Sequence, residues 1–450
     1  MTAIRDENAT DGSRLESEFE HRPVPLSHRK PTRSVAAVWF GFPMILTCAV
    51  FGGLLCAFLG FQAAIGAILV GNLILFLYVG ALSYLAGSTG LNFGLQAARV
   101  FGRIGSLVVA GFLATVVTGW FAFQTGLTGA TVNQSFGWSE KPVTLIAGVL
   151  FVGITFIGIR ALSWLGMVAA PFFILLAIVA LVLIATGTGL SGVWNYPGLG
   201  GGMAFGAGVT LVVATFADSG TMTADFTRWS RSGREAVKAT ITAFPIANLA
   251  SFIVGAVIVA SGAISDPATN GGNFLPLLAT GHGTFLTVIA FLFVFINLGS
   301  VCTHCLYNGA VGWSQMTGSR MRLMTLILGA IGTLAALTGI WSHFLDWLNV
   351  LGVFVPPIGA VIITDQLLLR RLRQDRPVAT IRVTAAISYA LGAIAAGIIH
   401  YQAPQFAEVV VGMIVAALSY WILGTFLDAR NPTVRTARPA GVAGADQLEE

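Results

Sequence analysis

Charged residues are scarce in this sequence: they make up 10% of the 450 residues, whereas hydrophobic residues make up 56%. A soluble domain of this composition would lack the polar surface that is needed to cover its core. The apolar residues form long runs, and nearly all charged residues lie in the short gaps between them. The sequence therefore predicts a polytopic membrane protein, for which the lipid bilayer is the main solvent.

Cysteine is also rare, and the common enzyme motifs are missing. The four cysteines lie inside apolar runs, which argues against a disulfide framework. Cys302 and Cys305 have CxxC spacing, but without a second ligand pair we expect them to pack as small hydrophobic residues. There is no Walker A, HExxH or GxSxG motif. We expect no ATP-driven transport within this chain, no enzyme activity and no cofactor.

Twelve apolar runs are long enough to cross the roughly 30 Å hydrocarbon layer as helices. They do not alternate polar and apolar residues, so all-α spans are favoured over strands of a β-barrel. The predicted spans are 34–60, 63–87, 104–130, 142–160, 163–187, 203–220, 239–262, 284–313, 321–340, 344–366, 383–400 and 405–427.

Lysine and arginine residues mark one side of the predicted membrane. They gather before the first span, after every second span and in the C-terminal tail, whereas the other loops carry few besides Lys141. This alternation predicts that both termini are cytoplasmic in a cell inner (plasma) membrane. Residues 1–33, which have no apolar signal-peptide region, and 428–450 are expected to be disordered tails. The net charge of +5 reflects these loops and anionic lipid, not nucleic acid.

Two predicted spans look interrupted. The first span combines Pro43 with the Gly52-Gly53 pair, and the sixth contains polar residues and glycine over 215–220. These positions correspond if the first ten spans form two five-helix halves, 34–187 and 203–366, followed by two more helices in 383–427. Interrupted helices in matching positions indicate a secondary transporter with its site at the membrane midplane. The alternative is a pair of ordinary helix kinks.

Several polar or aromatic residues near these interruptions could bind a ligand. Trp120 and Gln124 lie four residues apart on one face of the third span, where an indole can stack on a flat ring and an amide can bond its edge. In the sixth span, Phe216 adds a second aromatic ring, while Thr215 and Ser219 add hydroxyl groups. Asp218 is the sharpest candidate, because a carboxylate at membrane depth is costly and usually functional. Its alternative is a structural group bonded to backbone amides.

Further polar residues lie in the eighth and tenth spans. His304 could titrate, although a lone buried histidine is more often simply hydrogen-bonded. Pro356-Pro357 predicts a bend in the tenth span that could serve a gate. Asp365 lies beside a cluster of arginines, so we expect it to form an ion pair.

Several segments resemble the nucleobase:cation symporter-1 family, in particular its bacterial cytosine-permease branch. They are SGTMTADFTRWSR at 219–231, LNVLGVFVPPIGAVIITD at 348–365, VGNLILFLY at 70–78 and the Gly119-Trp120 pair, within a similarity over about 25–427. The resemblance implies about twelve transmembrane helices with the inverted five-plus-five repeat of sodium-coupled amino-acid symporters, and broken helices 1 and 6.

The resemblance also implies roles for individual residues. A flat heterocycle would lie between Trp120 and Phe216, with hydrogen bonds from Thr215 and Asp218. Gln124 matches a substrate-binding glutamine of the hydantoin-transporting branch, and Cys302 stands where the cytosine branch has a substrate-binding asparagine.

The family's sodium site implies a second set of residues. Its backbone carbonyl positions fall on Gly41, Met44 and Asn297, and its two hydroxyl positions on Ser300 and Val301. Valine has no side-chain oxygen, whereas hard cations prefer five or six oxygen ligands. Because Asp218 meanwhile adds a carboxylate, we expect the coupling ion to be a proton rather than sodium, with sodium bound near the acid as the alternative.

The sequence thus predicts a secondary active importer of a small planar nitrogen heterocycle, such as cytosine or a purine, coupled to a cation by alternating access. Hydantoin, allantoin or a thiamine-precursor pyrimidine are alternative substrates. An uncoupled facilitator is a second class, and a membrane-embedded enzyme or sensor is a third.

Overall fold

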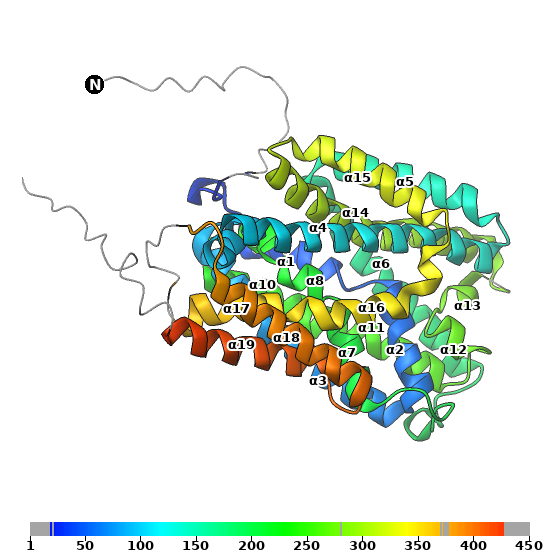
Figure 1. Ribbon diagram of the computed structural model, residues 1–450. Coiled ribbons are helices and arrows are strands. Elements are labelled where there is room, and N and C mark those ends of the chain that lie inside the picture. The colour runs from blue at the N-terminus through cyan, green and yellow to red at the C-terminus, as the bar shows by residue number, and fades with distance from the viewer. Residues whose placement is uncertain (1–18, 20–21, 280, 370, 372–377, 427–450) are drawn as a thin grey trace, which may run out of the picture.

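The computed structural model describes residues 19, 22–279, 281–369, 371 and 378–426, and the predicted tail 428–450 lies outside them. The described part is a bundle of helices without a strand (Figure 1). The α-helices are α1 (Thr32–Gly41), α2 (Leu46–Leu59), α3 (Phe61–Thr89), α4 (Phe93–Phe136), α5 (Glu140–Ile157), α6 (Ile159–Thr186), α7 (Phe205–Ala214), α8 (Ala217–Thr221), α9 (Ala224–Thr227), α10 (Gly233–Ile241), α11 (Asn248–Ala260), α12 (Pro267–Asn270), α13 (Leu275–Ala279), α14 (Gly283–Thr317), α15 (Met321–Ala336), α16 (Phe344–Phe354), α17 (Pro356–Ile363), α18 (Val383–Gln402) and α19 (Glu408–Phe426).

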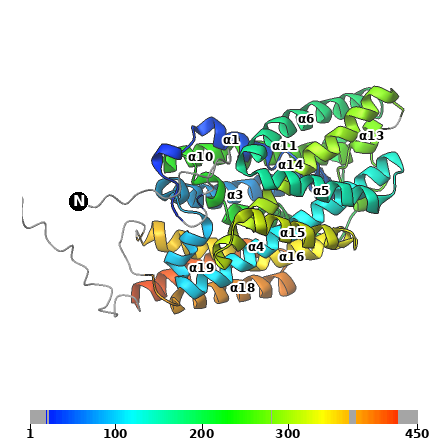
Figure 2. The same cartoon turned by 90° about the horizontal axis from the view of Figure 1, so that it is seen from above.

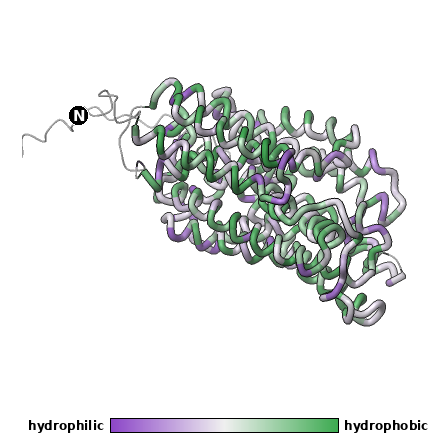
Figure 3. The backbone as a smooth tube through the Cα atoms, turned by 60° about the horizontal axis from the view of Figure 1, so that its bottom comes forward, coloured by the Kyte–Doolittle hydropathy of each residue, from purple (hydrophilic) through white to green (hydrophobic). Residues whose placement is uncertain are grey.

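The described helices account for all twelve predicted spans. Within the part of the chain that the structure describes, nine helical stretches are long and apolar enough to cross a membrane, including Gly233–Ala260 and Trp347–Leu368, in which shorter helices join. α1 and α2 form one more span, and α7 and α15 are shorter apolar helices at the positions of the sixth and ninth predicted spans. Hydrophobic residues predominate along the helices (Figure 3). The all-α membrane fold is therefore confirmed.

Large hydrophobic side chains cover the outside of the bundle, and small residues allow helices to pack closely inside it. Large hydrophobic side chains such as Leu77, Val149 and Ile394 are more than half exposed, as expected for helices that face lipid. α18 packs against α19 along one side of the bundle in both views (Figures 1 and 2). Inside, α2 packs closely on α11 because Gly52 and Gly255 leave no side chain between the two backbones.

The first span is broken where the sequence predicted. α1 ends at Gly41, α2 begins at Leu46, and their axes differ by 52°. In the sixth span, α7 ends at Ala214 and α8 begins only at Ala217, because Phe216 leaves helical geometry with a φ of −132°. The tenth span is divided between α16 and α17 at Pro356, where proline cannot donate to the preceding turn.

Two ends of predicted segments differ from the structure. α4 starts at Phe93 rather than near 104, and a break at Gly102, with a φ of 83°, separates its first turns from the rest. Residues 379–382 bond to the chain around this break, as in the bond from the Arg103 amide to the Ala379 carbonyl at 2.9 Å. In the expected N-terminal tail, the Val24 amide bonds to the Gly90 carbonyl and Lys30 pairs with Ser230, so this part is ordered against the bundle.

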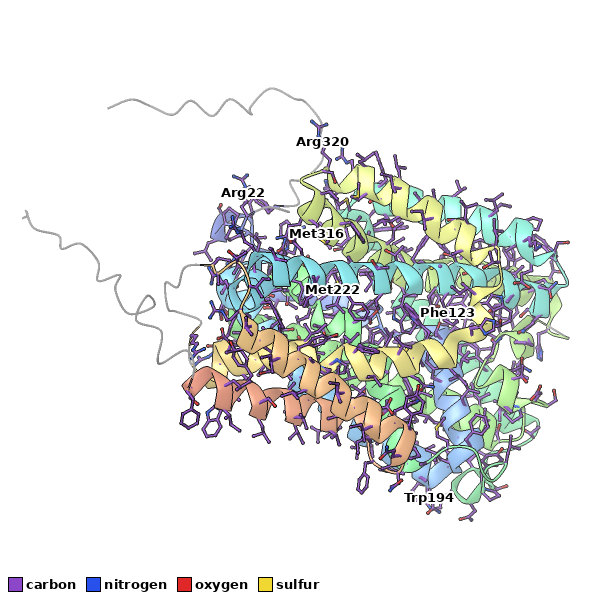
Figure 4. All side chains as sticks on the ribbon, in the orientation of Figure 1. Arg22, Phe123, Trp194, Met222, Met316 and Arg320 are labelled. Carbon is purple, nitrogen blue, oxygen red and sulfur yellow. The ribbon has the colours of Figure 1, made fainter. Side chains whose placement is uncertain are left out.

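The two ends of the bundle differ in character. The basic Arg22 lies toward one end, and Trp194 lies toward the other (Figure 4). Arg29 stays at the first end because its guanidinium bonds to the Gly87 and Ser230 carbonyls. We refer to this as the predicted cytoplasmic end.

Candidate functional site

A small buried cavity lies between the breaks of the first and sixth spans. The space open to a water-sized sphere is only about 10 Å³, at the point where the first span, α4, the sixth span and α14 meet. Five predicted ligand-binding residues line it: Trp120, Gln124, Thr215, Phe216 and Ser219. Sequence reasoning did not assign a ligand contact to the other lining residues, which are Phe42, Ile45, Thr47, Val301 and Cys305.

Aromatic rings form the apolar part of the cavity wall. Trp120 is buried and packs edge-on against Phe123, with the ring centres 5.9 Å apart. Phe216 reaches the cavity because it sits in the break between α7 and α8, and its ring centre lies 5.4 Å from that of Phe42. A planar ligand in this cavity would therefore meet an aromatic ring from each of two different spans.

The polar groups of the cavity come from both breaks and from α4. Thr47, in the first turn of α2, donates a hydrogen bond of 2.7 Å to the Gln124 side-chain oxygen. Thr215 donates its hydroxyl to the Leu211 carbonyl, also at 2.7 Å. A hydroxyl that has given its only proton can still accept, so Thr215 offers the cavity an acceptor.

Asp218 is fully buried in the first turn of α8, but it does not itself line the cavity. Its Oδ1 accepts from the Ser219 backbone amide at 2.7 Å and from the Ser219 hydroxyl at 3.4 Å. Its Oδ2 has no hydrogen bond of good geometry among the described residues, although the Trp120 side chain is close enough to interact with the carboxyl. The Asp218 carboxyl group therefore neighbours two residues that line the cavity, Trp120 and Ser219, without lining it itself.

The eighth span contributes a different cysteine from the predicted one. Cys302 lies outside the cavity lining, with its sulfur 3.7 Å from the Thr125 hydroxyl. Cys305, almost one helical turn further along α14, lines the cavity instead.

His304 lies among aromatic rings rather than in the cavity wall. Its Nδ1 is bonded to the Ser300 carbonyl one turn earlier, and its ring centre lies 5.1 Å from that of Phe42 and 5.6 Å from that of Phe226. Phe42 and Phe226 also contact Trp39 in the same cluster. The cluster extends from Phe42, which lines the cavity, to Trp39 of α1 and Phe226 of α9.

Two of the residues expected to bind the coupling cation, Met44 and Asn297, are in contact at the break of the first span. The Asn297 side chain accepts from the Leu46 amide at 2.7 Å and donates to the Met44 carbonyl at 2.9 Å, so it links α14 to the broken segment. Gly41 packs against Gly166 of α6 with no room for a side chain on Gly41. The Ser300 hydroxyl is buried and has no hydrogen-bond partner among the described residues.

A cation fits this arrangement in part. The unpaired Ser300 oxygen lies on α14 next to Gly166, and a carbonyl such as that of Met44 keeps a second lone pair. Val301 lines the cavity, and its side chain supplies no oxygen. Within the described residues there is no cluster of three or more acidic, histidine or cysteine side chains that could hold a metal ion.

Asp365 forms the expected ion pair. Its Oδ1 lies 3.3 Å from an Arg371 guanidinium nitrogen and accepts from the Tyr420 hydroxyl at 2.8 Å. This carboxylate therefore joins the end of the tenth span to α19 and takes no part in the cavity.

Two broken helices with a cavity between them are typical of secondary transporters. Residues 23–424 match the family described as permeases for cytosine/purines, uracil, thiamine and allantoin, and the chain belongs to this family. The cytosine permease of Escherichia coli (strain K12) is 29% identical over 421 residues, which cover 94% of this chain and 97% of that protein. The hydantoin permease of Microbacterium maritypicum is 24% identical over 366 residues, or 76% and 73% of the two chains.

Solved structures share the fold. Mhp1, a nucleobase-cation-symport-1 family transporter in a closed conformation with bromovinylhydantoin bound, has a TM-score of 0.75 at 20% identity and covers 90% of this chain and 96% of its own. A Na⁺-coupled sialic acid symporter has a TM-score of 0.66 at 12% identity, with 88% and 90% covered. The family and the fold predicted from the sequence motifs are both confirmed.

Proposed function

We propose that this permease imports a nucleobase or a related planar nitrogen heterocycle by cation-coupled symport with alternating access. The observation that carries the proposal is the cavity between the two helix breaks, in which Trp120 of α4 and Phe216 of the sixth span supply aromatic rings and Gln124 and Thr215 supply polar edges. Flat, polar-edged rings are the ligands that such walls suit. Similarity over nearly the whole length of cytosine permease supports a nucleobase as the substrate.

Hydantoin is the second candidate substrate. Similarity to a hydantoin permease supports it, and so does Gln124, which lines the cavity. Allantoin and a thiamine-precursor pyrimidine belong to the same chemical class. Purified protein in proteoliposomes should take up at least one radiolabelled ligand among cytosine, uracil, adenine, hydantoin and allantoin. Accumulation above the external concentration separates symport from a facilitator, which can only equilibrate its substrate.

A proton is our proposed coupling ion. Asp218 is a fully buried carboxyl group directly behind the cavity wall, where it can exchange a proton in step with substrate binding. The candidate sodium site supports the alternative only in part, because Val301 has no oxygen to offer while Ser300 has one.

Uptake under one imposed gradient at a time distinguishes the two ions. Proton coupling predicts accumulation under an inward pH gradient in sodium-free buffer, and Asp218→Asn should abolish that accumulation while leaving exchange of substrate across the membrane. Uptake that requires sodium and ignores the pH gradient would refute the proton and assign coupling to the Ser300 region.

The basic end of the bundle, with Arg29 and Arg228, is proposed to face the cytoplasm of a bacterial-type plasma membrane, with both termini on that side. Labelling of single cysteines introduced beside Arg29 and beside Trp194, from one side of sealed vesicles, tests this orientation.

A further inference from the structure

The hydrogen bond between Thr47 and Gln124 fixes the orientation of a polar group in the cavity wall. Both side chains are fully buried and both line the cavity. The Thr47 Oγ1 donates to the Gln124 Oε1 at 2.7 Å, although the two residues are 77 positions apart in the chain. The contact forms only because the second half of the broken first span packs beside α4.

This bond turns the Gln124 side-chain oxygen toward Thr47 and leaves the amide nitrogen to meet a ligand. Its Oε1 accepts from Thr47, whereas its Nε2 is buried and has no hydrogen-bond partner among the described residues. A side-chain amide nitrogen carries two N–H groups, and burying them without an acceptor is costly. A ligand that places an acceptor beside Gln124 would satisfy this nitrogen.

Thr215, at the break of the sixth span, has the complementary character. Thr215 gives its only hydroxyl proton to the Leu211 carbonyl, so toward the cavity it can only accept. A ligand that satisfies both side chains therefore presents an acceptor to Gln124 and an N–H donor to Thr215. Cytosine carries both groups on adjacent positions of one ring.

We propose that Thr47 is a positioning residue that holds Gln124 as a hydrogen-bond donor and so selects substrates with a carbonyl oxygen on the edge that faces α4. This inference rests on the proposed function, since it names which edge of a planar heterocycle the site reads. Thr47 acts through Gln124 and needs no contact of its own with the ligand.

The test compares ligands in which an amino group replaces a carbonyl oxygen. The pairs are cytosine with 2,4-diaminopyrimidine, uracil with cytosine, and hypoxanthine with adenine, each measured by equilibrium binding to the full-length protein. Gln124→Glu, whose carboxylate only accepts, identifies the pair whose varied position faces residue 124. In that pair the preference should move toward the amino ligand by about tenfold.

In the same pair, the wild-type protein should favour the carbonyl ligand. Thr47→Val keeps the shape of the side chain but removes the hydroxyl, so the amide can turn and the preference should fall at least about threefold. Thr47→Ser restores the hydroxyl and should restore the preference. A purely structural role for Thr47 would lower binding of both ligands together and leave their ratio unchanged.

Three results would overturn the inference: an unchanged ratio in Thr47→Val, a wild-type preference for the amino ligand in that pair, or no response of any pair to Gln124→Glu. Failure of the proposed function looks different. In that case the wild-type protein binds none of these bases and no hydantoin, and the inference fails with it.

Discussion

Replacing Asn297 should destabilise the broken segment of the first span, because this side chain bonds the segment to α14. Its side-chain amide makes two hydrogen bonds across the helix interface, to the Leu46 amide at 2.7 Å and the Met44 carbonyl at 2.9 Å, and all three residues are buried. Each bond that is lost leaves a buried backbone group unpaired, which costs about 1–3 kcal/mol. Asn297→Ala should therefore destabilise the folded protein by roughly 2–6 kcal/mol.

A matched control lies further along the same helix. Asn308 is equally buried, but neither atom of its side-chain amide has a hydrogen-bond partner among the described residues. Asn308→Ala removes the same atoms without breaking a bond, and should leave stability unchanged or slightly higher. Asn297→Asp keeps the acceptor for the Leu46 amide and loses the donor, but it also buries a charge, so it serves only as a second test of the donor.

Two assays measure the effect. Denaturation of the detergent-solubilised protein gives the difference between Asn297→Ala and Asn308→Ala. Amide hydrogen exchange of the peptide that contains Leu46 measures the stability of the broken segment directly. Its rate should increase about tenfold for each 1.4 kcal/mol by which the local free energy of opening falls. Because Met44 is an expected cation ligand, cation dependence of binding should weaken as well. Equal stability of the two alanine variants, with unchanged exchange at Leu46, would refute the linking role of Asn297.

Three further perturbations follow from single contacts. Trp120→Ala should lower ligand affinity about ten- to hundredfold in an equilibrium binding assay, because stacking on the indole is lost. The control is Trp164→Ala on α6, where the side chain is 62% exposed and the variant should bind ligand normally. Equal affinity of the two variants would exclude an aromatic clamp. Gly359→Ala should destabilise the protein, because the added methyl group would overlap the Tyr78 ring, while Gly153→Ala meets no atom within 4 Å and is the control in a thermal-unfolding comparison. Burial raises the pKa of Asp225, at the predicted cytoplasmic end, to about 6, although Arg228 and the Phe93 amide favour its charged form. The folded state therefore holds the proton of the Asp225 carboxyl group more tightly than the unfolded state does, so the unfolding free energy should fall as the pH rises from about 4 to 6. If Asp225→Asn showed the same fall in a pH titration of stability, this assignment would be contradicted.

Local sequence features predicted much of the fold correctly. Hydrophobic runs gave the spans because the bilayer imposes a length and a polarity on each helix separately. The breaks at 42–45 and 215–216 were predictable because proline, glycine and polar residues interrupt helices wherever they occur. The limits of α4 were missed, since the break at Gly102 depends on residues 379–382 packing beside it.

The sequence predicted which residues of the site share one face of a helix, but not which helices bring their faces together. The four-residue spacing of Trp120 and Gln124 places both on one helical face, and both line the cavity. Cys302 and Cys305 could not be ranked in this way, because the rotation of α14 about its axis is set by its neighbours. Thr47 carried no signal beyond its place in the broken span.

The sequence by itself determined the all-α membrane class of this protein and the family to which it belongs, because hydropathy and sequence motifs are properties of contiguous residues. The tertiary structure alone decided which side chains work together. Asn297 reaches the first span across 251 positions and Thr47 reaches Gln124 across 77. Such bonds depend on the mutual rotation and depth of helices that are distant in the chain, and a single sequence does not record either quantity.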